Sequence, residues 1–472
     1  MNIDDKQPGR ESFKYELDEH FFEKYASKGF NLIRLAVTWA NIEPAPGKYN
    51  ESYLQSLDGI FRNAEKHGVY ILIDMHQDLF SDFGLGIGDG APAWACITDG
   101  YTAKPPKYVW IEGYLWGKWV HRAFDHFWNN DTVCGKGLQE HFADMWKMLA
   151  ERYGGSPALF GYDILNEPFP GSDSKKMFAR LIKSALGVIL FSPKINRGQL
   201  FEALIHKDMP ALLGSIGGNV VRDIMKNIDG LAAEFDTKKY SPFLNRVARA
   251  IRQASPYGII MLEQSFLCNG GVRQSVPPIT VNGKRERLQC FGPHSYDMTV
   301  DTPLYKYADA DRVKAFFGEM QNTQLRLEVP VIAAEWGGCS DNKDTSWFGH
   351  AFELLDYFDE NLWSQTYWDY HGDDLDSPLM ELLSRTYPVA VAGIADTIST
   401  DREKGVFTLK YRSPAPGESL IYIHKAADIV CDGEAVTVAE YSPCARLVKI
   451  TANAGEHTIQ ITFKRGKGDE KH

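Results

Sequence analysis

The sequence predicts a (β/α)8 barrel followed by a small β-sandwich, and three observations lead to this prediction. Short apolar runs alternate with longer helical patterns along most of the chain, as strands and helices do in a parallel α/β fold. The apolar runs are nearly continuous, which is typical of strands buried on both faces. Beyond Gly393 the helical patterns stop, and short strands separated by turn residues take their place.

Seven apolar runs supply strands two to eight of the predicted barrel. They are residues 30–39, 69–76, 159–167, 257–263, 288–296, 329–336 and 363–370. Only residues 1–6 remain to supply strand one, ahead of a first helix at 17–28. We therefore expect strand one to be cut short in this chain or to be irregular.

Amphipathic helical patterns fill the segments between these strands. The clearest lie at residues 51–67, 138–152, 243–253 and 310–327. The segment 171–240 is longer than a barrel connection needs, and it has helical patterns of its own at 177–191 and 200–213. We interpret it as a helical insertion on the loop side of the barrel.

The chain divides into a barrel domain at 1–393, which contains the insertion 171–240, and a β-sandwich at 394–466. Strands of the sandwich are expected at 405–412, 419–425, 445–451 and 457–464. The last residues, 467–472, are polar and charged, and we expect them to be disordered.

Composition argues against several functional classes. The net charge is −11, with 51 Lys and Arg against 62 Asp and Glu, and no basic patch indicates a nucleic-acid partner. The seven cysteines include no CxxC pair, which argues against a zinc ribbon or a disulfide framework. No pattern indicates an obligate protein partner.

The sequence leaves the compartment of the protein open. Residues 1–10 are polar and do not resemble a signal peptide, and no apolar run has the roughly 18–20 residues that span a bilayer. Since the chain begins inside the predicted fold, we expect a truncated amino terminus, and an exported enzyme remains an alternative.

Polar side chains gather where the predicted strands end, which is where a barrel holds its active site. Strand four ends at Asn166 and Glu167, and strand seven ends at Glu335, across the barrel. The other candidates are Arg34 in strand two, His76 and Asp78 after strand three, His294 and Tyr296 after strand six, and Trp368 in strand eight.

Two carboxyl groups facing each other predict glycoside hydrolysis. Such a reaction needs one group to protonate the leaving oxygen and, in a retaining enzyme, a second group about 5–5.5 Å away to attack the sugar. We assign Glu167 as the general acid/base and Glu335 as the nucleophile. Arg34 is the candidate partner that keeps Glu335 ionised.

The remaining candidates suit sugar binding. The amide of Asn166 can bond the sugar 2-OH, and His294 and Tyr296 can position the two carboxylates. The spacing of His76 and Asp78 also resembles a metal site, but we prefer contacts to sugar hydroxyls. Two carboxylates need no metal for this reaction, so we predict no metal and no cofactor.

Structural alternatives remain for the same residues. Glu167 could be a solvated carboxylate at a helix start, and Glu335 could belong to a buried ion pair. His294, Tyr296 and Trp368 could each serve packing of the barrel rather than binding.

Several segments resemble the endoglycoceramidases of glycoside hydrolase family 5. They are EPAPGKY at 43–49, DMHQD at 74–78, GAPAW at 90–94, RAFDHFW at 122–128, DILNEPF at 163–169 and PVIAAEWG at 330–337. The likeness extends from residue 1 to about 393 and resumes loosely in the predicted sandwich. The segments 74–78 and 122–128 narrow it to the branch that cleaves glycosphingolipids.

The resemblance implies a retaining barrel hydrolase with a β-sandwich and no metal, which cuts the β-bond between a sugar or glycan and ceramide. It places the same two roles on Glu167 and Glu335, and it matches further site residues of the family with Asn166, His76, Asp78, His294, Tyr296 and Trp368. A sugar-binding lysine follows strand one in the family, and Lys6 is its counterpart here.

Three alternative functions remain open from the sequence. One is exo-cleavage of glucosylceramide or a sterol glucoside, one is an endo-β-glucanase of the same fold, and one is a non-catalytic glycolipid-binding protein. The insertion 171–240 could guide a lipid tail or lie on a membrane or micelle surface, or it could be a helical cap packed on the barrel.

Overall fold

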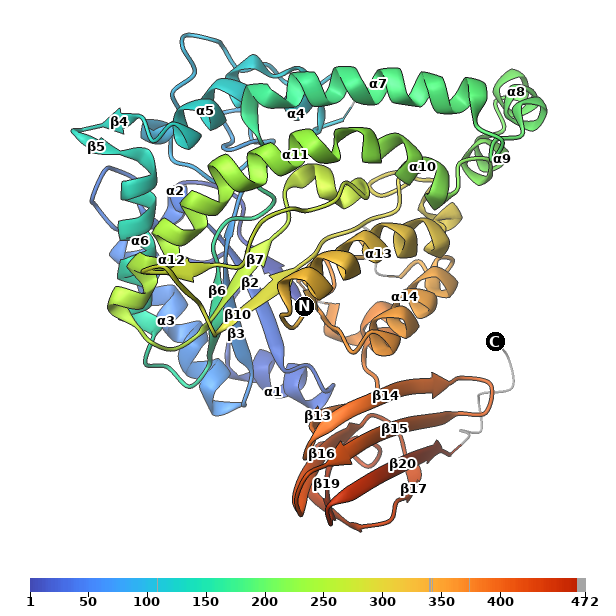
Figure 1. The fold of residues 1–472 in the computed structure, drawn as a ribbon. Coiled ribbons are helices and arrows are strands. Elements are labelled where there is room, and N and C mark those ends of the chain that lie inside the picture. The colour runs from blue at the N-terminus through green and yellow to red at the C-terminus, as the bar shows by residue number, and fades with distance from the viewer. Residues whose placement is uncertain (108, 339–340, 342, 373, 465–472) are drawn as a thin grey trace.

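The computed structural model describes residues 1–472 except 108, 339–340, 342, 373 and 465–472, so the predicted disordered tail at 467–472 lies outside the described residues. The chain forms a large α/β part and a smaller part built only of strands (Figure 1).

Six parallel strands form the continuous part of the barrel wall. Their order follows the sequence: β1 (Asn2–Asp4), β2 (Leu32–Thr38), β3 (Tyr70–His76), β6 (Leu159–Asp163), β7 (Ile259–Glu263) and β10 (Gln289–Gly292). The short β1 is strand one of the barrel, which we expected to be cut short or irregular. It has three buried residues and pairs in parallel with β2, with Ile3 opposite Leu35.

Two further strands close the barrel. β11 (Ile332–Ala333) pairs in parallel with β12 (Ser364–Gln365), and a bridge between Phe291 and Val331 joins β11 to β10. On the other side, the backbone N–H of Asn2 donates to the carbonyl oxygen of Tyr367 at 2.9 Å. The eight strands therefore form a closed ring, and the predicted barrel is confirmed.

Helices that follow the strands form the outer ring, as the sequence predicted. They are α1 (Glu19–Ser27), α3 (Glu51–Lys66), α6 (Leu138–Tyr153), α12 (Ser241–Ala254), α13 (Ala310–Leu327), α14 (Phe348–Glu360) and α15 (Pro378–Leu383). At the start of several of these helices, a side chain accepts a hydrogen bond from a backbone N–H group of the first turn. Asp18, for example, caps α1 by accepting from the N–H of Phe21 at 2.8 Å.

Small further elements lie in the connections between the strands. They are α2 (Trp39–Ile42), η1 (Ala93–Ala95), α4 (Glu112–Trp116), α5 (Lys118–Trp128), β4 (Thr132–Val133), β5 (Lys136–Gly137), η5 (Phe266–Gly270), β8 (Thr280–Val281), β9 (Lys284–Arg285), η6 (Tyr305–Tyr307) and η7 (Asp374–Asp376). Between β7 and β10 a 3-10 turn and a hairpin stand where a barrel helix would be.

The segment 171–240 is helical over most of its length. It contains η2 (Gly171–Asp173), α7 (Ser174–Phe191), α8 (Arg197–His206), α9 (Met209–Gly214), α10 (Gly218–Met225), η3 (Lys226–Ile228), α11 (Asp229–Phe235) and η4 (Asp236–Tyr240). Within the described part of the chain, no helix combines the length and the apolarity needed to cross a membrane.

Two four-stranded antiparallel sheets form the carboxyl-terminal part, as predicted. One holds β13 (Tyr387–Ala390), β16 (Gly417–Ile423), β19 (Arg446–Ala452) and β18 (Glu434–Glu440), and the other holds β14 (Ile394–Asp401), β15 (Val406–Ser413), β20 (Gly455–Phe463) and β17 (Ala427–Val430). Their inner faces share an apolar core that includes Phe407 and Ile421. Because β13 already belongs to these sheets, we propose to divide the domains between α15 and β13.

The sandwich contacts the barrel near the amino-terminal end of β2. The hydroxyl of Tyr422 donates to the carbonyl oxygen of Ser27 at 2.8 Å, and the hydroxyl of Tyr387 donates to that of Gly29 at 2.5 Å. Gly29 has φ +86°, and a Cβ there would lie 2.2 Å from the Tyr422 ring. The sandwich thus lies at the amino-terminal end of the barrel. An active site is expected at the opposite end, where the strands have their carboxyl ends.

Candidate active site

Acidic, basic and imidazole side chains meet at the carboxyl ends of the barrel strands and are largely buried. His76 ends β3, Glu263 ends β7, and Asn166 and Glu167 follow β6 by a few residues. Beyond β10 and β11, a bridge pairs His294 with Glu335, which brings these two residues side by side. The ring of strands therefore aims side chains from distant parts of the chain at one point.

Glu167 is held by its backbone as well as by its side chain. Its φ of +43° is unusual for a residue other than glycine and carries a conformational cost. The surroundings hold this conformation, since the Glu167 N–H donates to Glu263 Oε2 at 2.7 Å and Gln77 Nε2 donates to the Glu167 carbonyl oxygen at 3.1 Å. Asn269 Nδ2 donates to the carboxylate oxygen Oε1 at 2.5 Å.

The environment of Glu167 favours its protonated form. The side chain is buried, and this desolvation raises the pKa of Glu167 above its ordinary value, with a further contribution from the nearby charge of Glu335. The contact with His294 opposes the shift without reversing it. A carboxyl group with a raised pKa can deliver a proton near neutral pH.

Glu335 lies in a different environment although it is equally buried. Arg34 donates from Nη1 to Glu335 Oε1 at 2.7 Å, and the Tyr296 hydroxyl donates to Oε2 at 2.7 Å. A guanidinium and a phenol thus both donate to the same carboxylate, one to each oxygen. Both partners also fix the direction in which its oxygens point.

His294 connects the two glutamates. Its Nδ1 lies 2.9 Å from Glu167 Oε1 and 3.4 Å from Glu335 Oε2, and one carboxylate oxygen of each glutamate lies within 4.8 Å of the other and of His294. Burial opposes a charged imidazole, but Glu263 and Glu335 outweigh it and place the pKa of His294 well above its ordinary value. The spacing of the glutamates fits the roughly 5–5.5 Å of a retaining glycosidase.

Arg34 neutralises a group of buried acids beneath these glutamates. Its guanidinium lies 2.7 Å from Asp163 Oδ2, 2.5 Å from Glu263 Oε1 and 3.0 Å from Asp74 Oδ2, in addition to its bond to Glu335. It also donates to Asn166 Oδ1 at 3.0 Å. The side chain is fully buried, so the pair energies are little screened by solvent.

We expect Arg34→Met to destabilise the fold by roughly 3–5 kcal/mol, because it leaves buried carboxylates without their counter-charge. Denaturant unfolding followed by intrinsic fluorescence measures this change. The control is Arg412→Met, which removes an exposed ion pair with Asp396 on the sandwich and should leave the unfolding midpoint nearly unchanged. Equal midpoints for the two variants would contradict the assigned role of Arg34.

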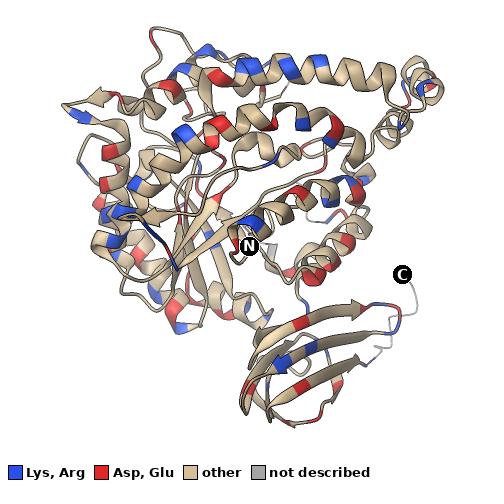
Figure 2. Cartoon of the chain, viewed as in Figure 1, with Lys and Arg blue, Asp and Glu red and all other residues tan. Residues whose placement is uncertain are grey.

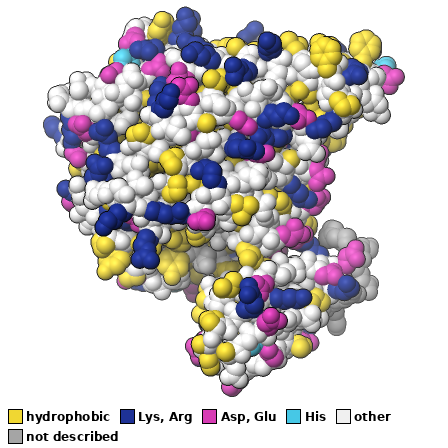
Figure 3. Space-filling model, viewed as in Figure 1, with side chains coloured by type: hydrophobic (Ala, Val, Ile, Leu, Met, Phe, Trp, Pro, Cys, Tyr) yellow, Lys and Arg dark blue, Asp and Glu magenta, His cyan; other side chains and the backbone are white. Residues whose placement is uncertain are grey.

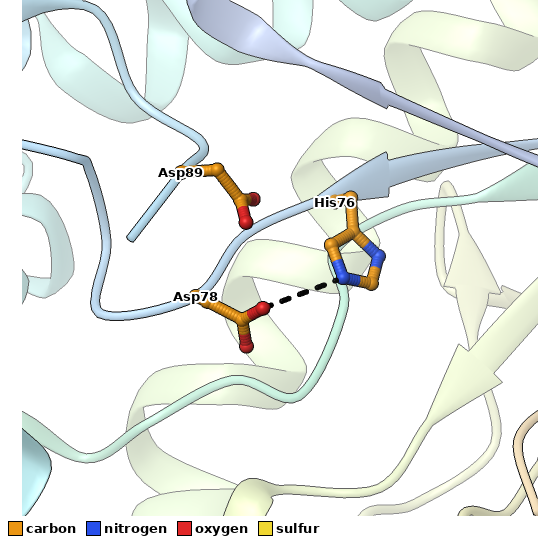
Figure 4. A group of neighbouring side chains, drawn as sticks. All are labelled: His76, Asp78 and Asp89. Carbon is orange, nitrogen blue, oxygen red and sulfur yellow. Dashed lines mark ion pairs between the residues drawn. The ribbon is translucent and has the colours of Figure 1, made fainter. Parts of the chain in front are cut away.

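A second polar cluster includes His76, Asp78 and Asp89 (Figure 4). Lys6 Nζ lies 2.7 Å from Asp78 Oδ2 and 4.0 Å from Asp89 Oδ2, and it stands 4.5 Å from the centre of the Trp368 ring. His76 stacks on the same indole, with ring centres 5.1 Å apart and planes 13° apart. The cluster thus gathers an indole, an imidazole, an ammonium group and carboxylates, which are groups that suit the apolar faces and the hydroxyl groups of sugars.

The acids of this cluster do not titrate alike. Burial acts to raise the pKa of Asp78, but the ammonium of Lys6 and the contacts with His76 outweigh it and lower that pKa. Burial and the charge of Asp78 raise the pKa of Asp89 to about 8. The cluster therefore offers both a hydrogen-bond acceptor and a carboxylic acid that can donate near neutral pH.

Three groups of side chains at the barrel mouth are close enough together to ligate a cation. They are His76 with Asp78 and Asp89, Glu167 with His294 and Glu335, and Asp74 with Asp163 and Glu263. The ammonium of Lys6 lies against the first group, and the guanidinium of Arg34 lies against the third and against Glu335. Protein cations thus already balance these acids, and the prediction of a metal-free site stands as a prediction.

The structure brings all ten predicted site residues into one connected network. The predicted residues are Lys6, Arg34, His76, Asp78, Asn166, Glu167, His294, Tyr296, Glu335 and Trp368, and each contacts at least one other member. Sequence reasoning missed Glu263, Asp163, Asn269 and Asp89. Glu263 closes an apolar strand as Glu335 does, and that signal could have found it. Asn269 lies in the 3-10 helix η5 and Asp89 lies in a loop, and neither has such a signal.

The comparison with protein families covers most of the chain. A family model described as "Cellulase (glycosyl hydrolase family 5)" matches residues 7–374, and one described as "Glycoside hydrolase family 5 C-terminal domain" matches residues 385–462. The first match contains all of the predicted site residues except Lys6.

Curated relatives support the same grouping, and solved structures share the fold. An endoglycoceramidase of Hydra vulgaris is 30% identical over 439 residues, which span 84% of this chain and 70% of the relative. Endoglycoceramidase I of Rhodococcus hoagii is 23% identical over 94% of this chain and 80% of its own length. The structure of endo-glycoceramidase II from Rhodococcus sp. superposes with a TM-score of 0.70 at 24% identity, covering 96% of this chain and 93% of that one. Further structures of that enzyme show a lactosyl-enzyme intermediate and a complex with ganglioside GM3.

Proposed function

This chain belongs to glycoside hydrolase family 5, and from that premise we propose that it is a retaining β-glycosidase that releases the sugar part of glycosphingolipids from ceramide. The observation that carries the proposal is that one carboxylate oxygen of buried Glu167 lies within 4.8 Å of one of buried Glu335, although the two side chains have unlike environments. Arg34 and Tyr296 favour a charged Glu335, whereas burial favours a protonated Glu167.

These two environments match the two steps of a double displacement. In the first step, a carboxylate oxygen of Glu335 attacks the anomeric carbon while Glu167 gives its proton to the ceramide oxygen, and ceramide leaves as an alcohol. In the second step, the ionised Glu167 takes a proton from water, and the oxygen of that water displaces Glu335 from the sugar. Glu167 ends protonated and Glu335 ends ionised, ready for the next turnover.

The remaining side chains have binding and positioning roles in this proposal. Trp368 lies beneath the sugar ring, while Lys6, His76 and Asp78 contact its hydroxyl groups. Asn166, fixed by Arg34, bonds the 2-OH in the transition state. His294 and Tyr296 orient the two glutamates, and no step requires a metal or a cofactor.

Ceramide as the leaving group is supported by the relatives rather than by the barrel alone. Both curated relatives named above are endoglycoceramidases, and the solved relative forms a complex with ganglioside GM3. Since such substrates reside in membranes or micelles, we also propose that the enzyme works at a lipid surface.

Hydrolysis of a panel of glycolipids tests the substrate class. We expect the enzyme to release intact lactose and ceramide from lactosylceramide. Thin-layer chromatography of the products measures this release. Release of glucose from glucosylceramide, without any cleavage of lactosylceramide, would replace the proposal by exo-glucosidase action. Activity on a soluble cellulose derivative alone would identify a glucanase, and binding of the glycolipids without product would identify a non-catalytic binding protein.

A further inference from the structure

A long helix and two short ones extend from the barrel and leave large apolar side chains in solvent. We name residues 174–214, which comprise α7, α8 and α9, the arm; it extends along one edge of the molecule (Figure 1). Its exposed apolar residues are Ile182, Leu186, Ile189, Leu190, Phe191, Phe201, Leu204, Ile205 and Met209. Figure 3 shows hydrophobic side chains gathered over this end of the molecule.

The apolar residues of α7 form one stripe rather than a scatter. Ile182, Leu186 and Leu190 recur every four residues, which places them on one face of the helix. The exposed fractions of the Leu190 and Phe191 side chains rise to 58% and 80% at the end of this helix. Beyond it, Phe201 in α8 is 65% exposed. Contiguous apolar surface of this kind marks a surface that binds another apolar body.

The arm is basic although the chain is acidic. Residues 174–214 contain seven Lys and Arg and two Asp and Glu, a net charge of +5, whereas the whole chain carries −11. Lys176, Arg180 and Lys183 recur at intervals of four and three and form a second stripe on α7. Figure 2 shows Lys and Arg residues along this helix.

The arm also lies on the side of the barrel where the candidate active site opens. α7 follows β6, the strand that leads to Glu167, and the short helix α4, which follows β3, packs beside α7. Trp116 at the end of α4 is 67% exposed. Two connections from the carboxyl end of the barrel thus present apolar side chains together.

We propose that the arm docks the enzyme on an anionic phospholipid surface. The proposal rests on the proposed function, since it supplies the place where a lipid-anchored sugar would meet the site. The apolar stripe enters the boundary between headgroups and acyl chains, and the neighbouring lysines and arginines bind lipid phosphates. The positive charge of the arm favours an anionic surface and disfavours a symmetric dimer in which two arms would meet.

Vesicle co-sedimentation tests the docking. We expect the full chain to bind vesicles containing about a third phosphatidylglycerol and to bind pure phosphatidylcholine vesicles at least about tenfold more weakly. Binding to the anionic vesicles should fall steeply as NaCl rises from about 0.05 to 0.5 M, because salt screens the lysine–phosphate attraction. Equal binding to both kinds of vesicle would overturn the charge selection.

Substitutions distinguish binding through the arm from nonspecific binding through other exposed apolar residues. The triple variant Phe191→Ser, Phe201→Ser, Ile205→Ser should lower vesicle affinity at least about tenfold, since it removes apolar area that the lipid buries on binding. The matched control is Leu325→Ser, Val430→Ser, Ile394→Ser, whose side chains are 64–69% exposed on α13 and the sandwich, and it should bind as the unchanged protein does. Equal loss in both variants would contradict the proposal.

Charge substitutions give an independent readout. The variant Lys176→Gln, Arg180→Gln, Lys183→Gln should weaken binding to anionic vesicles about tenfold or more while leaving binding to neutral vesicles unchanged. Unchanged binding to anionic vesicles, or an equal loss on both kinds of vesicle in a variant with the unchanged aryl lactoside rate, would overturn the assignment of these residues to phosphate binding.

Two further measurements distinguish the arm from the active site. All of these variants should hydrolyse a soluble aryl β-lactoside at the unchanged rate. If the proposed function is wrong, the unchanged protein will not hydrolyse this substrate. If only the docking proposal is wrong, hydrolysis of this substrate will be normal. Light scattering after size-exclusion chromatography should show a monomer, and a dimer that the Phe191→Ser, Phe201→Ser, Ile205→Ser variant abolishes would replace the lipid surface by a second copy.

Discussion

Glu335→Gln is expected to lower turnover of lactosylceramide by several orders of magnitude, as loss of a nucleophile does. The amide has nearly the shape of the carboxylate and can still contact Arg34 and Tyr296, but it cannot attack the anomeric carbon. Single-turnover and steady-state rates, measured with lactosylceramide and with an aryl lactoside, should fall alike. Both substrates need the same attack in the first step.

Three controls accompany this measurement. Glu360→Gln changes an acid at the end of α14 away from the strand carboxyl ends and should keep the full rate. The unfolding midpoint of the Glu335 variant shows whether its fold is intact. Mass spectrometry of the unchanged enzyme after reaction with a 2-fluoro lactoside should find the sugar on a peptide that contains Glu335. A label on another residue, or near-normal turnover of the variant, would remove Glu335 from this role.

Glu167→Gln should show a loss that depends on the leaving group. Ceramide is a poor leaving group that requires protonation, so its release should slow by several orders of magnitude. An aryl lactoside with an acidic phenol leaves without a proton, so its first step should be far less affected. A burst of phenol followed by slow turnover is expected, because hydrolysis of the glycosyl-enzyme still lacks its base.

The pH profile provides a second test of Glu167. Burial and Glu335 raise the pKa of Glu167, so this carboxyl keeps its proton to higher pH than an ordinary glutamate. In the unchanged enzyme, kcat/KM for lactosylceramide should therefore hold through mildly acidic pH and fall as pH rises through that raised pKa. The Gln variant should lose this descending limb. Equal losses on both leaving groups, with the limb retained, would assign the proton to another group.

Much of the candidate site could be predicted from strand ends alone. An apolar run that closes with Asn166 and Glu167, and another that closes with Glu335, indicate side chains that the fold places at the barrel mouth. The supporting acids were harder to predict. Asp163 lies within a buried strand, and its partner Arg34 lies 129 positions away in the sequence. Only the closed ring of strands brings that pair together.

The irregular parts of the fold were the hardest to predict. Strand β1 has three residues, too few for a periodic pattern, and it is fixed by register with β2 and by bonds to the last barrel strand. The four edge strands of the sandwich, β13, β14, β17 and β18, were not predicted, and β18 is exposed along most of its length. Local composition carries little information where a strand has no buried face.

The order of strands and helices, the pair of glutamates and the basic, apolar helix at 174–191 were determined by the sequence itself, because burial and charge leave periodic marks along the chain. The tertiary structure decided which acids share Arg34, that His294 lies between the two glutamates, and that the apolar side of the arm stays uncovered. The physical reason is closure. A barrel joins residues from distant strands at one end, and both distance and desolvation there depend on every strand at once.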